Sequence, residues 1–337
     1  MSVRTRIAVL GGSGYTAVEL MKILLRHPHA EIVAVTSREV KSVSDFHPSL
    51  LGRIDLACEP FDAAAMKDKG VEVAFGCLPH GAGAEAVKPL LSAGIRVVDL
   101  SADYRLKDAA VFERWYGEPP HDPANLARAV YGLPELYREQ IRHADLVANP
   151  GCYPQTAILG LAPLIRHNLI EPADIIVNSV SGVSGAGRTP KLAAHFPECN
   201  ESVIAYNVGK HRHTPEMEQA LSDLAGRPVE ILFAPHLVPM DRGIHSTIYA
   251  VPTTDATESD LRELYRDFYR NEPFIRLRAS PPATKDTAHT NYLDLCVSLI
   301  RGKVVILAAE DNLIRGAAGV AVQNFNLMFG YPEPMGL

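Results

Sequence analysis

Residues 6–17 read RIAVLGGSGYTA, an apolar segment of strand type, then a glycine-rich turn, then the start of a helix. This order suits a dinucleotide, because glycine lets a pyrophosphate approach the backbone and the helix N-terminus supplies N–H donors and partial positive charge. Gly12, Gly14 and Ala17 fit the G-x-G-x-x-G/A spacing of such turns. The stretch predicts a nucleotide-binding α/β domain, and a tight turn without a ligand is the alternative.

The end of the next strand, residues 31–35, indicates which dinucleotide binds. About 20 residues after such a turn, a carboxylate accepts a hydrogen bond from the ribose 2′-hydroxyl of NAD. Thr36, Ser37 and Arg38 stand there instead, and hydroxyls beside an arginine suit the 2′-phosphate of NADP. We therefore expect NADP(H) as the cofactor, with a solvated Arg38 as the alternative. The expected cofactor-binding residues of this region are Gly11, Gly12, Ser13, Gly14, Tyr15, Thr16, Ser37 and Arg38.

Strands and helices continue to alternate through the first half of the chain. Strand patterns recur at 71–75, 95–100 and 146–148, with a helix pattern at 82–93. Such alternation predicts a parallel, doubly wound sheet of the Rossmann type.

The second half has a different pattern, with several strands and few helices between them. These strands are expected at 175–180, 229–233, 246–251, 293–300 and 304–309. The pattern predicts a second, α+β domain built on a mixed, largely antiparallel sheet. The boundary between the two domains is expected near residue 149.

Cys152 lies where a strand meets a helix. The segment 149–154, NPGCYP, separates the strand at 146–148 from an apolar helical run that ends at Ile165. Backbone N–H groups and the helix macrodipole at such a turn favour a thiolate over a neutral thiol. In a doubly wound sheet this turn would also lie at the carboxyl end of a strand, where ligands bind. Cys152 is therefore a candidate nucleophile, and a buried structural thiol is the alternative.

Two loops of the second half are rich in groups that bind anions. Residues 181–188 read SGVSGAGR, and residues 209–216 read GKHRHTPE. In a strand, His211 and His213 would share one face, but the sequence TPE after them indicates a helix start. Histidine titrates near neutrality, so one of the two is a candidate for proton transfer with the cysteine. A basic loop with solvated histidines is the alternative.

Composition narrows the class of protein. A length of 337 residues with 47% hydrophobic content supports two sizeable cores. The formal net charge of −6, without long runs of one sign, predicts neither nucleic-acid nor membrane binding. Five scattered cysteines suggest no disulfide framework and no metal site, so a cytoplasmic location is expected. No apolar stretch of membrane-spanning length occurs, and the first residues lead directly into a strand, as expected without a signal peptide.

A cysteine nucleophile beside a nicotinamide points to one reaction type. A thiolate accepts an acyl group, and hydride transfer to the resulting thioester gives an aldehyde. The motifs that carry this chemistry resemble, nearly end to end, those of type 1 N-acetyl-gamma-glutamyl-phosphate reductases, a family of the semialdehyde dehydrogenase group. The resemblance rests on GGSGYTAVEL (11–20), TSRE (36–39), LPHG (78–81), DLSADYRL (99–106), NPGCYP (149–154), SGVSGAGR (181–188), HRHTPE (211–216), PHLVPM (235–240) and DNL (311–313).

This resemblance implies NADPH-dependent reduction of N-acetyl-L-glutamyl 5-phosphate to N-acetyl-L-glutamate 5-semialdehyde and phosphate, a step of arginine biosynthesis, through a thioester on Cys152. The catalytic histidine of the family maps to the HRHTPE block, where we expect His211 as the acid/base and keep His213 as the alternate. Asn312 lies in the late segment that contacts the cofactor in the family, so it is expected near the nicotinamide. The expected substrate-binding residues are Arg105, Asn149, Ser184, Arg188 and Lys191.

The resemblance also implies an organisation. A C-terminal helix over 317–329 would return to the cofactor domain, giving domains of 1–148 with 313–337 and of 149–312, the latter for catalysis and oligomerisation. A homo-oligomer, dimer or tetramer, is expected. His245 is a weak rival base, because aspartate-semialdehyde dehydrogenases place their histidine in a similar Gly-His-Ser segment. Departures from the family pattern are Ala17, Gln155, Arg315 and Val320.

Other functions remain as alternatives. The same chemistry on aspartyl phosphate or on a carrier-linked aminoadipyl phosphate would use the same active-site groups. A non-catalytic NADP-binding sensor would bind the cofactor but would show no phosphate-dependent turnover. A cysteine hydrolase would leave the N-terminal glycine turn without a role.

Overall fold

The computed structural model describes residues 4–337. The chain forms two compact units, one of residues 4–150 with Ala317–Leu337 and one of Gly151–Gly316. Within residues 4–337, no helix is both long enough and apolar enough to cross a membrane.

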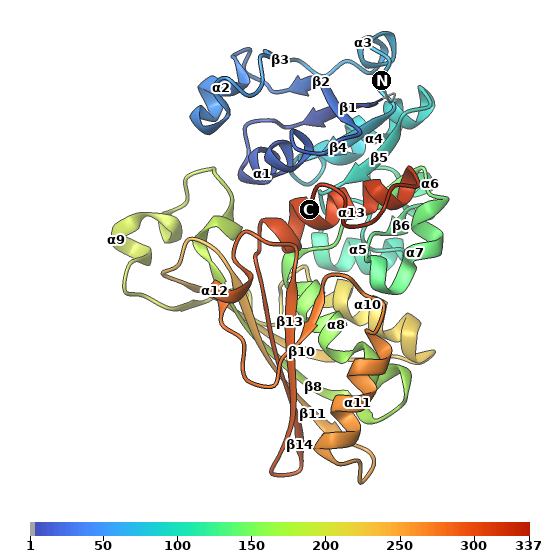
Figure 1. The fold of residues 1–337 in the computed structure, drawn as a ribbon, viewed down its shortest axis with the longest axis vertical. Helices are drawn as coiled ribbons and strands as arrows, with labels where there is room; N and C mark the ends of the chain where they lie inside the picture. Colours follow the sequence, from blue (N-terminus) through green and yellow to red (C-terminus); the bar gives the residue numbers. More distant parts are fainter. Residues whose placement is uncertain (1–3) are drawn as a thin grey trace. The chain divides into compact units, whose positions relative to one another are not determined.

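The first unit is built on a seven-stranded parallel sheet with the strand order β3-β2-β1-β4-β5-β7-β6 (Figure 1). The predicted parallel sheet is therefore confirmed. The strands are β1 (Thr5–Leu10), β2 (Ala30–Thr36), β3 (Cys58–Glu59), β4 (Val73–Gly76), β5 (Arg96–Asp99), β6 (Val130–Tyr131) and β7 (Leu146–Ala148). The α-helices are α1 (Tyr15–Leu24), α2 (Val43–Phe46), α3 (Ala63–Asp68), α4 (Ala82–Ser92), α5 (Ala109–Tyr116), α6 (Pro123–Leu126), α7 (Pro134–Arg142) and α13 (Gly319–Met328).

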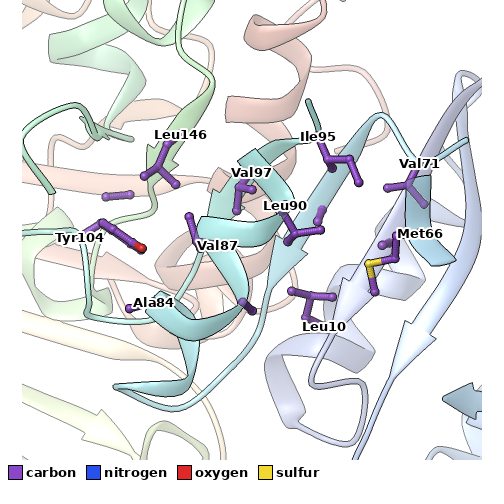
Figure 2. Packing of buried hydrophobic residues seen from close by; sticks show 14 of the residues in the cluster. Leu10, Met66, Val71, Ala84, Val87, Leu90, Ile95, Val97, Tyr104 and Leu146 are labelled. Carbon is purple, nitrogen blue, oxygen red and sulfur yellow. The ribbon is translucent and has the colours of Figure 1, made fainter. Parts of the chain in front are cut away.

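Apolar side chains between α4 and the sheet form the core that supports the nucleotide-binding edge. Leu90 of α4 and Val97 of β5 are fully buried, and Leu10 at the end of β1 belongs to the same cluster (Figure 2). Burying a side chain of this size contributes about 1.5–3 kcal/mol. The carboxyl ends of the central strands therefore rest on a well-packed layer.

Helix α13 belongs to the first unit, where it packs against α1 and α7. All ten of its residues are buried, so its polar side chains need partners. Asn324 donates hydrogen bonds to the Gly132 carbonyl and to Oδ1 of Asn149, and Oδ1 of Asn326 bonds to the buried ring of His27. These bonds fix the helix by specific contacts as well as by apolar packing.

The second unit is built on a mixed sheet with the strand order β12-β13-β14-β11-β8-β10-β9, in which four of the six neighbouring pairs are antiparallel. The predicted sheet type is confirmed. The strands are β8 (Ile170–Gly182), β9 (Ile204–Ala205), β10 (Ile231–Val238), β11 (Ile244–Pro252), β12 (Ile275–Leu277), β13 (Leu293–Ile300) and β14 (Lys303–Glu310). The α-helices are α8 (Cys152–Arg166), α9 (Phe196–Cys199), α10 (Thr214–Ala225), α11 (Glu258–Phe268) and α12 (Thr284–Thr287), and a π-helical turn spans Ile314–Ala318.

The two faces of this second sheet differ in burial. Successive residues of a strand point to opposite faces. One face is buried under α8, α10 and α11, which lie on the same side of the long strands in Figure 1. On the opposite face Ile176, Leu232 and Tyr249 are 39%, 59% and 42% exposed. The second unit therefore has an open sheet face with apolar side chains at its centre.

A buried layer of hydroxyl groups joins α8 to the covered face. The hydroxyl of Ser246 on β11 lies 2.7 Å from that of Thr156 on α8 and 2.7 Å from that of Ser179 on β8, and all three residues are fully buried. Thr156 also donates to the Tyr153 carbonyl. The three hydroxyls form hydrogen bonds with one another inside the core and fix where α8 lies on the sheet.

We predict that Ser246→Ala lowers the free energy of unfolding by about 1–3 kcal/mol, because it leaves two buried hydroxyls short of a partner. Urea denaturation measures the change. Ser298→Ala on β13, a half-buried serine of the open face, is the matched control and should change stability little. Equal stability of the two variants would contradict the structural role of the hydroxyl layer.

Candidate active site

The glycine turn lies between β1 and α1 in the first unit. Gly11 has a φ of +73°, and a Cβ there would lie 2.4 Å from the Cys77 carbonyl oxygen after β4. A Cβ on Gly12 would lie 2.3 Å from a methyl carbon of Val35 on β2. Only glycine fits at either position. Strand order reverses between β1 and β4, which is where doubly wound sheets bind nucleotides.

The first turn of α1 fits an anion. Gly14 is its N-cap, the helix carries no acidic residue in its first turn, and no side chain caps its N–H groups. Such a terminus offers N–H donors and partial positive charge. The residues from Gly11 to Thr16 therefore suit the pyrophosphate of a dinucleotide.

Ser37 and Arg38 follow β2, so they lie at the same carboxyl-terminal edge of the parallel sheet as the glycine turn after β1. The N–H of Ser37 donates to the Glu59 carbonyl, and Arg38 is exposed. Glu39 is the nearest acidic side chain along this segment, and its ion pair with Lys41 lowers the pKa of Glu39. Arg38 is thus an exposed positive charge next to an acid that is paired with Lys41.

Cys152 begins α8 in the second unit, with Gly151 as the N-cap. It is half-buried, whereas Cys58 and Cys296 are buried. Burial also raises the pKa of Cys77 to about 12, so that thiol stays protonated. A partly exposed thiol at a helix N-terminus has the surroundings of reactive cysteines rather than of structural ones.

Glu216 connects this turn to the histidine block. It lies in the first turn of α10 and is 1% exposed, and its Oε1 accepts a hydrogen bond of 2.6 Å from the Gly151 N–H. The sequence analysis gave Glu216 no role, although it is the last residue of the HRHTPE block. An acid three residues after His213, at the predicted helix start, was the signal that could have identified it.

His211 and His213 lie together, with ring centroids 4.7 Å apart, and both rings contact Tyr153, the neighbour of Cys152. The backbone N–H of His213 donates to Nδ1 of His211 at 3.1 Å. Burial, with a smaller effect of the Arg212 charge, lowers the pKa of His211 to about 4. His211 is thus neutral near pH 7, with its proton on Nε2. His213 is the half-buried N-cap residue of α10.

Two tyrosines line the same cluster. The hydroxyl of Tyr206 donates to that of Tyr153 at 3.0 Å, and Tyr153 donates to the His236 carbonyl at 3.2 Å. Burial raises the pKa of Tyr206 to about 12 and raises that of Tyr153 as well. Both phenols therefore stay neutral and cannot compete with a histidine for protons.

The chain also approaches Cys152 closely at Gly316. A Cβ at this position would lie 2.8 Å from Cβ of Cys152 and 3.1 Å from Oε1 of Glu310, so only glycine fits. Gln155, three residues after the cysteine, is fully buried and donates from Nε2 to the Arg315 carbonyl at 2.9 Å. Gln155 therefore fixes the segment before Gly316 against the start of α8. Glu310, fully buried at the end of β14, is a second acid beside Gly316 that sequence reasoning missed.

The expected substrate-binding residues fall into three groups. Arg188 and Lys191 are exposed in the loop after β8. Ser184 is buried in the second unit, where it accepts a hydrogen bond from Asn312, and Asn312 in turn accepts one from the Gly243 N–H. These bonds give Asn312 a part in shaping the loop that contains Ser184.

Asn149 and Arg105 form the third group, in the first unit. The Asn149 side chain donates to the Ala317 carbonyl and accepts from Asn324. The guanidinium of Arg105 donates to the carbonyls of Asn149 and Leu100. Both side chains thus stabilise the backbone around the end of β7.

His245 lies on the sheet face opposite to α8. Its neighbour Ser246 points to the covered face and bonds Thr156, so His245 points to the open one. Burial lowers the pKa of His245. This orientation disfavours it as a base for Cys152.

Known proteins match the chain over its whole length. Residues 6–144 match the family described as semialdehyde dehydrogenase, NAD binding domain, and residues 152–312 match semialdehyde dehydrogenase, dimerisation domain. The N-acetyl-gamma-glutamyl-phosphate reductase of Rhodopirellula baltica is 49% identical over 100% of this chain and 99% of its own. The protein of that name from Geobacter sulfurreducens is 50% identical over 98% of this chain and 97% of its own.

Solved structures share the fold at lower identity. Aspartate semialdehyde dehydrogenase II of Vibrio cholerae, complexed with ASA, has a TM-score of 0.73 at 16% identity, covering 98% of this chain and 99% of its own. Aspartate semialdehyde dehydrogenase with NADP from Candida albicans has a TM-score of 0.72 at 14% identity, covering 97% and 99%. The full-length sequence matches go beyond the fold: the chain belongs to the semialdehyde dehydrogenase family, in its N-acetyl-gamma-glutamyl-phosphate reductase branch.

Proposed function

We propose that the protein reduces N-acetyl-L-glutamyl 5-phosphate with NADPH to N-acetyl-L-glutamate 5-semialdehyde and phosphate, in arginine biosynthesis. The observation that carries the proposal is the half-buried Cys152 at the N-terminus of α8, joined through Glu216 to the two-histidine block. The relatives with this activity in their names match the chain from end to end. The cytoplasm suits this reaction, because reducing conditions there keep the thiol available.

In this mechanism the Cys152 sulfur attacks the acyl carbon, the carbon–oxygen bond to phosphate breaks, and phosphate leaves with the bonding electron pair. A thioester then joins the substrate to the enzyme. The N-terminus of α8 stabilises negative charge on sulfur before attack and again when the thiolate leaves. His213 takes up the thiol proton before attack and holds it until sulfur is released.

NADP(H) is the proposed cofactor, held at the pyrophosphate by Gly11 to Thr16 and at the 2′-phosphate by Ser37 and Arg38. When bound, it supplies the hydride that reduces the acyl carbon. Arg38 suits the 2′-phosphate because the neighbouring acid, Glu39, is paired with Lys41. Arg188 and Lys191 are proposed to attract the anionic substrate, on the basis of their exposure and charge.

The assay that tests this function follows NADPH formation at about 340 nm from NADP and N-acetylglutamate semialdehyde. We expect turnover only with phosphate present, and little with aspartate semialdehyde. Cys152→Ala should abolish turnover and leave NADPH binding nearly unchanged. If only aspartate semialdehyde shows phosphate-dependent turnover, the reaction type stands but the substrate assignment changes. If neither aldehyde is turned over, a non-catalytic NADP-binding sensor is supported.

We predict that His213→Asn lowers turnover by roughly 100 to 10,000-fold, the usual contribution of an acid/base group. His211→Asn should lower turnover less, because a histidine with a pKa of about 4 is a weak base near pH 7 and does not hold the thiol proton. Because His211 titrates near pH 4, His211→Asn should leave the pH dependence of the rate above about pH 6 unchanged. A larger loss at His211 would restore the assignment favoured by sequence alone.

We also propose that the protein is a homodimer formed through the open face of the second sheet. This region matches a dimerisation domain, and its exposed centre is apolar. A two-fold axis would place the same face of a second copy against it and bury both at once.

The expected outcome for Leu232→Asp is a monomer in size-exclusion chromatography with light scattering, because a charge at the centre of an apolar interface is left without a partner. Leu51→Asp changes an even more exposed leucine of the first unit and should leave the dimer intact. A dimer that survives Leu232→Asp would place the interface elsewhere.

A further inference from the structure

The residue that holds the glycine turn from outside is His47, which follows α2. Its side chain is buried, with 6% exposed, and its Nε2 lies 2.7 Å from the carbonyl oxygen of Gly12. A carbonyl only accepts hydrogen bonds, so the proton must be on Nε2 and His47 must be the donor. The proposed mechanism gives this hydrogen bond no role.

The bond determines how the Gly12–Ser13 peptide group is oriented. The structure has no cis peptide bond among residues 4–337, and in a trans peptide the C=O and the following N–H point in opposite directions. With the Gly12 carbonyl directed at His47, the Ser13 N–H must point away from His47. Ser13 belongs to the turn proposed to hold the pyrophosphate.

The two peptide N–H groups that precede Ser13, those of Gly11 and Gly12, form hydrogen bonds with Thr36 at the end of β2. The Gly12 N–H donates to the Thr36 carbonyl at 2.8 Å, and the Gly11 N–H donates to the Thr36 hydroxyl at 3.3 Å. Thr36 therefore fixes the entry to the turn, and His47 fixes the next peptide group. Without His47, the Gly12 carbonyl would lose this hydrogen bond, and glycine has the conformational freedom to let the Gly12–Ser13 peptide rotate.

We propose that His47 is a positioning residue for the cofactor, which orients the Ser13 N–H towards the pyrophosphate. The inference rests on the proposed dinucleotide site and assigns a new residue to it. An amide oriented before binding costs less conformational entropy when the ligand arrives. His47 thus acts through the backbone of the turn without touching the ligand.

The test measures equilibrium binding of NADPH and of adenosine 2′-phosphate, which keeps the 2′-phosphate but lacks the pyrophosphate. For His47→Leu we expect NADPH to bind about 5 to 10-fold more weakly, the range for one lost hydrogen bond. Adenosine 2′-phosphate should change by less than about twofold, because it makes no use of the turn. His47→Gln, which keeps an N–H donor at the same reach, should restore NADPH affinity to within about threefold.

His27→Leu is the matched control, because His27 is also a buried histidine of the first unit but bonds to Asn326. It should leave the ratio of the two affinities unchanged. Equal weakening of both ligands in His47→Leu would show a merely structural role and overturn the inference, as would unchanged NADPH binding.

The same experiment separates the inference from the proposed cofactor choice. NADH carries the same pyrophosphate, so His47→Leu should weaken NADH and NADPH by the same factor. A wild-type preference for NADH would overturn the choice of NADP, and an equal loss of both dinucleotides would still support His47. Arg38→Ala should instead weaken NADPH alone.

Discussion

The hydrogen bond between the Gly151 N–H and the Glu216 carboxylate is the contact on which the candidate active site depends. Helices α8 and α10 pack together, and both begin at this point. Two helix N-termini carry partial positive charge and repel each other. The buried carboxylate lies between them and lowers that cost, and the arrangement holds Cys152 and the histidine pair in one cluster.

Close backbone approach is the second constraint, and glycine meets it in both units. Gly316 lies against Cys152 where a methyl group would overlap the cysteine side chain, and Gly12 lies against Val35 where it would overlap the strand. A side chain fixes a peptide group next to each glycine. Gln155 donates to the Arg315 carbonyl just before Gly316, and His47 donates to the carbonyl of Gly12 itself. A flexible residue is made rigid by a neighbour that donates to a backbone carbonyl.

Much of this architecture could be predicted from the sequence. The glycine turn and the alternating strands predicted the parallel sheet, and the NPGCYP segment predicted the cysteine at a helix start. The two-residue strands β3 and β6 could not be predicted, because they are too short to show a pattern. The order of preference between His211 and His213 was also beyond reach, since it depends on burial and on a bond from one residue's backbone to the other's ring.

The alternation of its strands would let the second sheet link the proposed catalysis to the proposed association. On β11, Ser246 points to the covered face and bonds α8 through Thr156, while His245 points to the open face. A strand that supports the nucleophile helix on one side thus presents its other side to the proposed partner. Because packed interiors transmit strain, burial of the open face would stiffen the support on which α8 rests. Loss of the proposed dimer would therefore act on the helix that begins at Cys152 without removing any group that takes part in the proposed reaction.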